Sequence, residues 1–221
     1  MSEQFDCAVP GERETGIASA ISALKGGRLV VMPTDTVYGI GADAFDSAAV
    51  AALLAAKGRG RDMPVPVLVG SWDTIGGLVY SVPQSAQELI RAFWPGALSL
   101  VVRQAPSLQW DLGDANGTVM LRMPLHPVAI ELLREVGPMA VSSANISGRP
   151  PAVTVAQARE QLGDLVEVYL DGGPAEQQAA STIVDLTGTH PRVLRQGPVS
   201  AEAIAAVLGV EAASLTATTT D

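Results

Sequence analysis

Apolar residues recur along this chain at two spacings, one typical of helices and one of buried strands. Apolar positions three and four residues apart predict helices at residues 12–25, 47–57, 85–94, 127–136, 155–162 and 201–208. Short unbroken apolar runs predict strands at residues 29–32, 65–69, 97–102, 118–122, 139–142 and 166–170, with a late pair at 181–185 and 192–194. Asp46-Ser47 and Ser200 are typical N-caps, and Pro127 stands where a first-turn proline belongs.

This alternation predicts a single α/β domain with a twisted, open, mixed sheet and flanking helices. There is no domain-breaking linker and no internal repeat. We expect residues 1–12 to form a loose lead-in and residues 209–221, which end in a Thr-rich segment, to form a flexible tail. Pro66, inside an apolar run, predicts either an edge strand or an irregular strand start.

The stretch from Arg28 to Phe45 changes character halfway along. An apolar run ends at Pro33 and is followed by Thr34-Asp35-Thr36 and Gly39-x-Gly41. One interpretation is a strand whose carboxyl end opens onto a ligand site, where glycines let a backbone approach closely. The other is an ordinary turn in which Thr and Asp bond their own backbone. Gly39-x-Gly41 lacks the third glycine of a dinucleotide fingerprint, so the pattern alone leaves both open.

Composition narrows the classes of function. With 48% apolar residues in 221, the chain can build a sizeable core without disulfides, and its single cysteine, Cys7, cannot form an internal bridge. No run resembles a signal peptide or a membrane span, so we expect a cytoplasmic protein that does not contact membranes. The net charge of −9 and the scarcity of aromatic residues argue against a protein that coats nucleic acids.

Two polar segments are candidates for binding a phosphate. Lys57-Gly58-Arg59-Gly60-Arg61 concentrates cations after a predicted helix, where they could clamp phosphates or simply complement the helix dipole. The segment from Ser142 to Gly148 follows a predicted strand and offers hydroxyls and an amide, which suit a polyphosphate or a ribose. A helix cap or a serine-rich turn is the more common explanation for such a segment.

Isolated polar residues give weaker signals. Arg122 ends an apolar strand and needs an anionic partner, which is either a ligand or a structural salt bridge. Asp35 could bind Mg²⁺, although an aspartate beside threonines more often forms a turn. His126 and His190 show no metal-ligand spacing, so we expect no protein metal site and interpret both as structural.

A set of motifs follows in a fixed order along residues 12–208: Pro33-Thr34-Asp35-Thr36-Val37-Tyr38-Gly39-Ile40-Gly41-Ala42, Lys57-x-Arg59, Trp94-Pro95-Gly96, Val119-x-Leu121-Arg122-Met123-Pro124-x-His126-Pro127, Ser143-Ala144-Asn145-x-Ser147-Gly148, Ser181-Thr182-Ile183 and Leu194-Arg195-x-Gly197-Pro198. Taken together and in this order, these motifs resemble the YrdC-like family of threonylcarbamoyl-AMP synthases, of the short, single-domain type. The resemblance implies a YrdC-like domain over residues 12–208.

The resemblance implies a nucleotidyltransferase that converts L-threonine, bicarbonate and ATP to threonylcarbamoyl-AMP and pyrophosphate. The product would serve threonylcarbamoyladenosine modification of tRNA, with tRNA or the tRNA-threonylcarbamoyl transferase machinery as further partners. Positioning and charge stabilisation could provide most of the rate, which agrees with the absence of a visible catalytic triad. Mg²⁺ is implied as the ion that accompanies ATP, held mostly by phosphate and water.

The resemblance also implies roles for individual residues. Lys57 and Arg59 match catalytic positions, and a larger set matches ATP contacts: Lys57, Arg59, Thr118, Ser143, Asn145 and Arg195. Thr34, Arg122 and Ser181 match positions that hold L-threonine, with Arg122 suited to its carboxylate.

This chain departs from the family pattern at four positions. Gly60 stands where many members have Pro, Met63 where Asn or Lys is common, Leu68 where some have His, and Gln196 where Pro is usual. Two alternatives to the synthase stay open: an RNA-binding module without catalysis, and a paralogue that makes another carbamoyl-adenylate.

Overall fold

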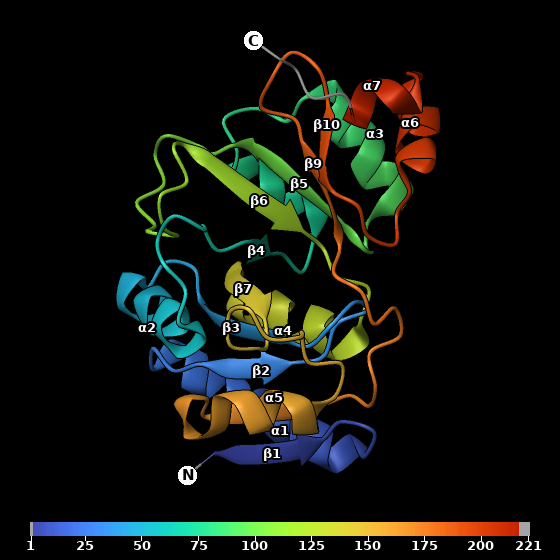
Figure 1. Cartoon of the computed structure of the whole chain (residues 1–221). Helices are drawn as coiled ribbons and strands as arrows, with labels where there is room; N and C mark the ends of the chain where they lie inside the picture. The colour runs from blue at the N-terminus through green and yellow to red at the C-terminus, as the bar shows by residue number, and fades with distance from the viewer. Residues whose placement is uncertain (1, 217–221) are drawn as a thin grey trace.

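The protein is built on one long, twisted sheet with helices on both faces (Figure 1). The computed structural model describes residues 2–216. Within them the ten strands run in the order β1-β8-β2-β3-β7-β4-β6-β5-β9-β10. Parallel and antiparallel pairs both occur, so the predicted mixed α/β sheet is confirmed. The strands are β1 Glu3–Asp6, β2 Val30–Met32, β3 Gly39–Asp43, β4 Val67–Leu68, β5 Leu98–Arg103, β6 Thr118–Arg122, β7 Met139–Ser143, β8 Val168–Asp171, β9 Thr182–Asp185 and β10 Arg192–Arg195.

The predicted helices all form, with ends within about two residues of those expected. They are α1 Pro10–Lys25, α2 Ser47–Lys57, α3 Gln84–Phe93, α4 Pro127–Val136, α5 Val155–Leu162 and α6 Ala201–Leu208. Asp46 caps α2 by accepting hydrogen bonds from the Ala48 and Ala49 amides, and Gly58 ends that helix in the left-handed conformation. Three short elements complete the fold: the 3₁₀ turns η1 Trp72–Gly77 and η2 Gly163–Leu165, and the helix α7 Ala212–Thr216.

Two hydrophobic cores lie on opposite faces of the sheet. Val30 and Met32 of β2 point to a core built with α1 and α4, whereas Val31 between them points to the larger core on the other face. This alternation follows from the two-residue period of a strand. Helices α2, α3, α5 and α6 contribute to the larger core. A strand buried on both faces is apolar at every position, which explains the unbroken run in the sequence.

The sheet narrows at β4, which has only two residues and pairs with β6 on one side and with β7 on the other. The alternative that Pro66 marks an edge strand is therefore wrong, and the irregular start is what forms. Pro66 lies just before β4 and its carbonyl accepts a hydrogen bond from the Val141 amide. A proline here is tolerated because the ladder needs only its acceptor.

Three segments have more structure than the sequence suggested. Residues 3–6 of the expected loose lead-in form β1, which pairs in parallel with β8. Residues 39–43, interpreted as part of a loop, form β3, where Gly39 and Gly41 lie against Val141 and Met139. The expected flexible tail contains α7, whose Leu215 is buried in the larger core. Residues 217–221 lie outside the described part of the chain.

The packing of α4 gives a test of the fold. Leu132 is fully buried between α4, α1 and the sheet, so Leu132→Ala should lower the free energy of unfolding by about 2–5 kcal/mol. Leu165, with 62% of its surface exposed, is the matched control, and Leu165→Ala should change it by less than about 0.5 kcal/mol. Urea titrations of both variants would measure the difference; equal losses would contradict the assignment of the core.

Candidate functional site

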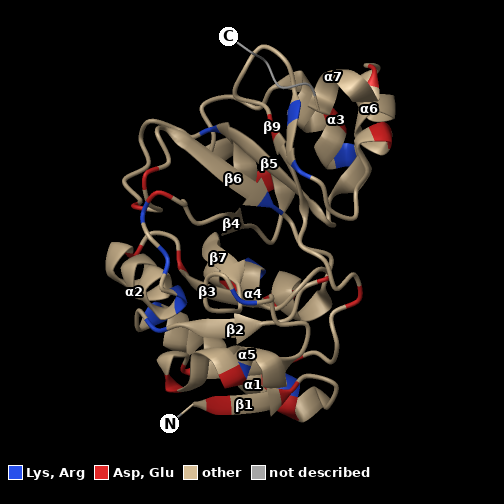
Figure 2. Ribbon diagram, viewed as in Figure 1, with Lys and Arg blue, Asp and Glu red and all other residues tan. Residues whose placement is uncertain are grey.

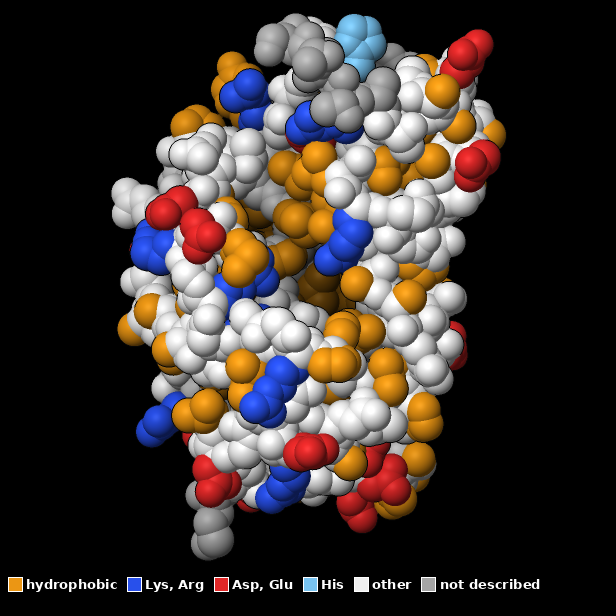
Figure 3. Space-filling model, viewed as in Figure 1, with side chains coloured by type: hydrophobic (Ala, Val, Ile, Leu, Met, Phe, Trp, Pro, Cys, Tyr) orange, Lys and Arg blue, Asp and Glu red, His pale blue; other side chains and the backbone are white. Residues whose placement is uncertain are grey.

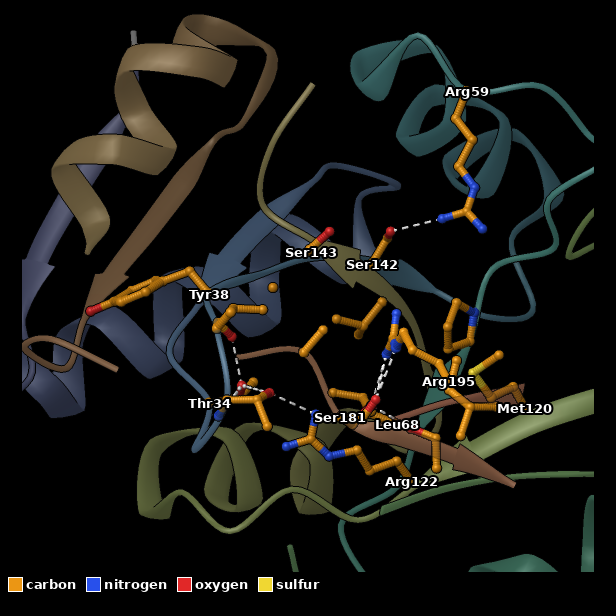
Figure 4. A pocket seen from close by; sticks show the side chains of 18 residues that line it. Thr34, Tyr38, Arg59, Leu68, Met120, Arg122, Ser142, Ser143, Ser181 and Arg195 are labelled. Carbon is orange, nitrogen blue, oxygen red and sulfur yellow. Dashed lines mark hydrogen bonds between the residues drawn. The ribbon is translucent and has the colours of Figure 1, made fainter. Parts of the chain in front are cut away.

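A cavity of about 190 Å³ opens on one face of the molecule, beside the narrow strand β4 (Figures 3 and 4). Its wall combines arginines, hydroxyl groups and apolar side chains, and none of the lining residues carries a carboxylate. Acidic residues lie outside the cavity wall, around β1, α1 and α6 and on the loops beside β4 and β6 (Figure 2). Despite its net charge of −9, the protein therefore has a local site suited to anions. The residues that line the cavity and are used below are Thr34, Thr36, Tyr38, Arg59, Leu68, Ser99, Met120, Arg122, Val141, Ser142, Ser143, Ser181 and Arg195.

The loop between β2 and β3 forms one wall of this cavity. The Thr34 hydroxyl donates to the Val37 carbonyl at 2.6 Å and accepts from the Thr36 amide at 3.2 Å, which fixes a tight turn directly after Pro33. The Thr34 and Thr36 hydroxyls lie 3.0 Å apart. The turn interpretation is confirmed for Thr34, whose hydroxyl bonds its own backbone, and the turn borders a cavity; a ligand site here stays a prediction.

Arg122, at the end of β6, forms a buried ion pair across the cavity with Asp35 of this loop. Arg122 Nη2 lies 2.5 Å from Asp35 Oδ1, and the two side chains are only 7% and 5% exposed. Arg122 also donates to the Thr36 hydroxyl from Nη1 and to the Gly96 carbonyl from Nε, each at 2.8 Å. The structural salt bridge is therefore confirmed. Burial lowers the pKa of Arg122, and Asp35 opposes that shift. Because a guanidinium has five N–H donors and three have partners among residues 2–216, two remain for a ligand.

Asp35 binds Arg122 through its Oδ1 atom. Its Oδ1 also accepts from the Leu125 amide at 2.9 Å. Neither Asp35 nor any other carboxylate lines the cavity, and residues 2–216 contain no cluster of three His, Cys, Asp or Glu that could hold a metal ion. The donor set of this site does not fit a resident Mg²⁺, which prefers carboxylates. The half-buried His126, whose pKa is lowered by burial, likewise belongs to no metal cluster of the described chain.

Arg195 and two serines form the opposite wall, on the β5, β9 and β10 side. Arg195 donates from Nε and Nη2 to the Ser181 carbonyl, at 3.0 and 2.7 Å, and from Nη2 to the Ser181 hydroxyl at 3.2 Å. The Ser181 and Ser99 hydroxyls lie 2.9 Å apart. Burial lowers the pKa of Arg195. Arg195 and Ser181 were predicted from the sequence; Ser99 was not, since it sits in a strand without a distinguishing motif.

Lys57 and Asn145 lie behind the cavity wall. Lys57 Nζ donates to the carbonyls of Ser143 and Asn145, and only 2% of the residue is exposed. The Asn145 amide donates to the carbonyls of Ile146 and Arg149. These two side chains therefore hold the end of β7 and the loop after it, and Ser142 and Ser143 at the end of β7 line the cavity. Burial, reinforced by the charge of Arg59, lowers the pKa of Lys57 to about 8.

Arg59 is the arginine of the loop after α2. Its Nη1 donates to the Ser142 hydroxyl at 3.1 Å (Figure 4). Its Nη2 donates to the Pro64 carbonyl at 3.2 Å. Its Nε is buried and has no hydrogen-bond partner among residues 2–216. A buried donor without an acceptor is costly, so this atom favours an anionic ligand. Thr118, another predicted contact, lines a separate, mostly apolar pocket that shares Met120 with the cavity.

Tyr38 is a residue of the site whose role the sequence did not reveal. It lines the cavity, and its hydroxyl donates to the Gly173 carbonyl at 2.6 Å and accepts from the Gly172 amide at 3.1 Å. Burial raises its pKa. These contacts attach the β2–β3 loop to the segment that leads from β8 to Ser181. The motif Val37-Tyr38-Gly39 was visible, but the partner of the hydroxyl lies some 135 residues further along the chain.

The ion pair predicts that the effects of changing Arg122 and Asp35 on the free energy of unfolding depend on one another. Asp35→Asn leaves a buried guanidinium without its counter-charge and should lower the free energy of unfolding by about 3–5 kcal/mol. The double variant Asp35→Asn/Arg122→Met removes both charges, so its loss should be smaller than the sum of the single losses. Denaturant titrations of the four proteins would measure the coupling, and additive losses would contradict it.

The lowered pKa of Lys57 predicts how stability depends on pH. Its folded pKa is about 8 against an ordinary value of 10.5, so between these pH values the unfolded chain binds a proton that the folded chain has released. The free energy of unfolding of the wild type should therefore rise relative to Lys57→Met from about pH 8 to about pH 10.5. A difference that stays constant over this range would show that Lys57 titrates normally.

The chain matches a protein-family model and several known proteins. The model Sua5/YciO/YrdC, described as telomere recombination, matches residues 22–197. A candidate threonylcarbamoyl-AMP synthase of Mycobacterium tuberculosis is 80% identical over 215 residues, which cover 97% of this chain and 99% of that protein. A candidate synthase of Mycobacterium leprae is 77% identical over 217 residues, covering 98% and 99% of the two chains.

Solved structures show the same fold. The crystal structure of Pyrococcus abyssi Sua5 complexed with L-threonine superposes with a TM-score of 0.88 at 34% identity, covering 95% of this chain and 61% of that one. Escherichia coli YciO, at 22% identity, has a TM-score of 0.79 and shares the fold over 90% of this chain and 97% of its own. With the family model matching most of its length and close relatives matching nearly all of it, this chain belongs to the Sua5/YciO/YrdC family.

Proposed function

We propose that this chain is a threonylcarbamoyl-AMP synthase, which makes threonylcarbamoyl-AMP and pyrophosphate from L-threonine, bicarbonate and ATP. The observation that carries the proposal is the cavity in which Arg59, Arg122 and Arg195 meet without a carboxylate in the wall. Threonine carries a carboxylate, and both its carbamate and the nucleotide are anions, so one cavity of this charge can bring the reactants together. The 80% identity to a candidate synthase supports the same activity.

The chemistry needs no nucleophile from the protein. The amine of threonine combines with bicarbonate to form a carbamate and water. A carbamate oxygen then attacks the α-phosphorus of ATP, a new P–O bond forms, and the bond to the β-phosphate oxygen breaks as pyrophosphate leaves. Such a reaction is accelerated by placing the two reactants in line and by stabilising charge on the phosphoryl oxygens. A wall of arginines and hydroxyls, with no side chain poised as a covalent nucleophile, is suited to this task.

Threonine is proposed to lie against the β2–β3 loop. The two N–H donors of Arg122 that lack partners would bind its carboxylate, and Thr34 and Ser181 would contact its polar groups. The apolar side chains of Leu68 and Val141 border the same cavity and would contact its methyl group. Leu68 lies beside Arg122, because the two residues are paired in the β4–β6 ladder of the sheet.

ATP is proposed to extend from the cavity toward Thr118. Arg59, Arg195 and Ser143 would contact the phosphates, and the neighbouring apolar pocket beyond Met120, lined by Thr118, would take the base. Lys57 and Asn145 would act by holding the Ser143 segment in place. Mg²⁺ would enter with ATP and be held by phosphate oxygens and water, because the cavity wall offers it no carboxylate.

The product is proposed to serve the threonylcarbamoyladenosine modification of tRNA, with transfer of the threonylcarbamoyl group made by a partner enzyme. Direct RNA binding without chemistry is the weaker alternative, because the net charge of −9 and the scarcity of aromatic residues do not favour a nucleic-acid surface. In the part of the chain that the structure describes, no helix is both long and apolar enough to span a membrane.

The reaction is tested by incubating the purified protein with ATP and Mg²⁺, with and without threonine and bicarbonate. Pyrophosphate release that requires both, together with an adenylate of the mass of threonylcarbamoyl-AMP, is the expected result. Turnover with carbamoyl phosphate instead of threonine and bicarbonate would favour the paralogue. Binding of tRNA without any turnover would favour the RNA-binding module.

Arg59 gives the sharpest test of the proposed phosphate site. Arg59→Ala removes an oriented donor and should cost about 2–4 kcal/mol of transition-state stabilisation, measured as kcat/KM for ATP. Arg28, on the surface and paired with Glu167 at 3.5 Å, provides the control, and Arg28→Ala should leave kcat/KM unchanged. An unchanged kcat/KM for ATP in Arg59→Ala would show that Arg59 does not contact the phosphates.

A further inference from the structure

The loop that carries Arg59 needs an external constraint. It runs from Gly58 to Pro66, between α2 and β4, and contains two glycines that give its backbone unusual freedom. We propose that Arg61 is a positioning residue: by binding Asp111 and Asp114 it fixes this loop so that Arg59 points at the phosphates of ATP. The inference rests on the proposed function, because it assigns ATP to Arg59.

Arg61 binds the long loop between β5 and β6 through a bidentate ion pair, called the fork below. Its Nη1 and Nη2 donate to the two carboxylate oxygens of Asp111 at 2.9 and 2.8 Å, and its Nε lies 3.4 Å from Asp114 Oδ1. A two-pronged pair of this kind fixes orientation as well as distance. Arg61 is 55% exposed, so the pair should contribute little to the overall stability.

Backbone contacts extend the connection on both sides of the fork. The Asp114 amide donates to the Arg61 carbonyl and the Val65 amide donates to the Leu112 carbonyl, both at 2.8 Å. Between them Gly113 adopts a φ of +102°, and a Cβ there would meet the Arg61 carbonyl oxygen at 2.8 Å. The two loops can approach this closely only because position 113 has no side chain.

The β5–β6 loop is itself anchored, and the loop from Gly58 to Pro66 contacts Arg59 directly. Trp110 is buried, donates to the side chain of Gln104 at 3.0 Å and stacks on Phe45 with ring centroids 5.5 Å apart. On the other side, the Pro64 carbonyl accepts a hydrogen bond from Arg59 Nη2. The contacts therefore run without a break from an anchored aromatic pair, through Arg61, to the guanidinium in the cavity.

The change in ATP affinity caused by Asp111→Asn/Asp114→Asn distinguishes positioning by Arg61 from a direct effect of its charge, because the two explanations predict opposite signs. If Arg61 attracted ATP only by its charge, Arg61→Ala would weaken ATP binding, but Asp111→Asn/Asp114→Asn would strengthen it, since two negative charges near the phosphates disappear. If Arg61 positions the loop, both changes should weaken ATP binding, because each breaks the fork. Asparagine keeps the size of the side chain and its ability to accept the hydrogen bond from the Gly113 amide.

The experiment measures binding of a non-hydrolysable ATP analogue and of L-threonine by calorimetry, using the whole protein. Arg61→Ala and Asp111→Asn/Asp114→Asn should each weaken analogue binding about fivefold, the scale of an exposed ion pair, with threonine binding unchanged. The charge exchange Arg61→Asp/Asp111→Arg should recover most of this loss. Arg28→Ala removes the same charge from another exposed pair and should bind the analogue as the wild type does.

Two outcomes overturn the proposal: tighter analogue binding by Asp111→Asn/Asp114→Asn, or equal weakening for the analogue and threonine in Arg61→Ala. Adenylate formation by the wild type is measured alongside. Absence of this product would overturn the proposed function itself, whereas product formation combined with either of the two outcomes would remove only the role of Arg61.

Discussion

The site depends on one buried ion pair, between Arg122 and Asp35. Arg122 ends β6 on one side of the narrow strand β4, and Asp35 belongs to the β2–β3 loop on the other side. Taking both charges out of water is costly, so the pair persists only because additional hydrogen bonds complete it: Arg122 donates to the Thr36 hydroxyl and the Gly96 carbonyl, and Asp35 accepts from the Leu125 amide. The same contacts fix the distance between the two walls of the cavity. Stability and the shape of the site are thus set by one cluster.

Much of the fold followed from periodicity, because long helices and doubly buried strands leave strong local patterns. The misses have a common cause. The strand Glu3–Asp6 is exposed and polar, and β3 contains two glycines, so neither has the apolar signature of a strand. Both form because β8, β2 and β7 provide partners for their backbones. Pairing of this kind depends on residues far away in the sequence and cannot be deduced from a local window.

The sequence identified several residues that line the cavity, but it did not reveal how they are arranged. The motifs pointed to Arg59, Arg122, Ser143, Ser181, Thr34 and Arg195, and all of them line the cavity. Lys57 and Asn145 came from the same motifs, yet the structure places both behind the wall, because their side chains reach backbone groups of the segment after β7. Asp35 pairs with Arg122 across 87 positions of sequence. Motifs identify residue types; the bonds that orient them arise only when the sheet brings the segments together.

A wall that holds three guanidinium groups and no carboxylate also bears on how a catalytic cycle ends. In the proposed reaction pyrophosphate leaves with all of the charge that its oxygens carried in ATP. A cavity that attracts the triphosphate by charge attracts this leaving group for the same reason, and the part of the attraction that is equal for bound ATP and for the transition state does not accelerate the chemical step. The arginine-lined wall then slows the release of pyrophosphate and not the formation of the new P–O bond.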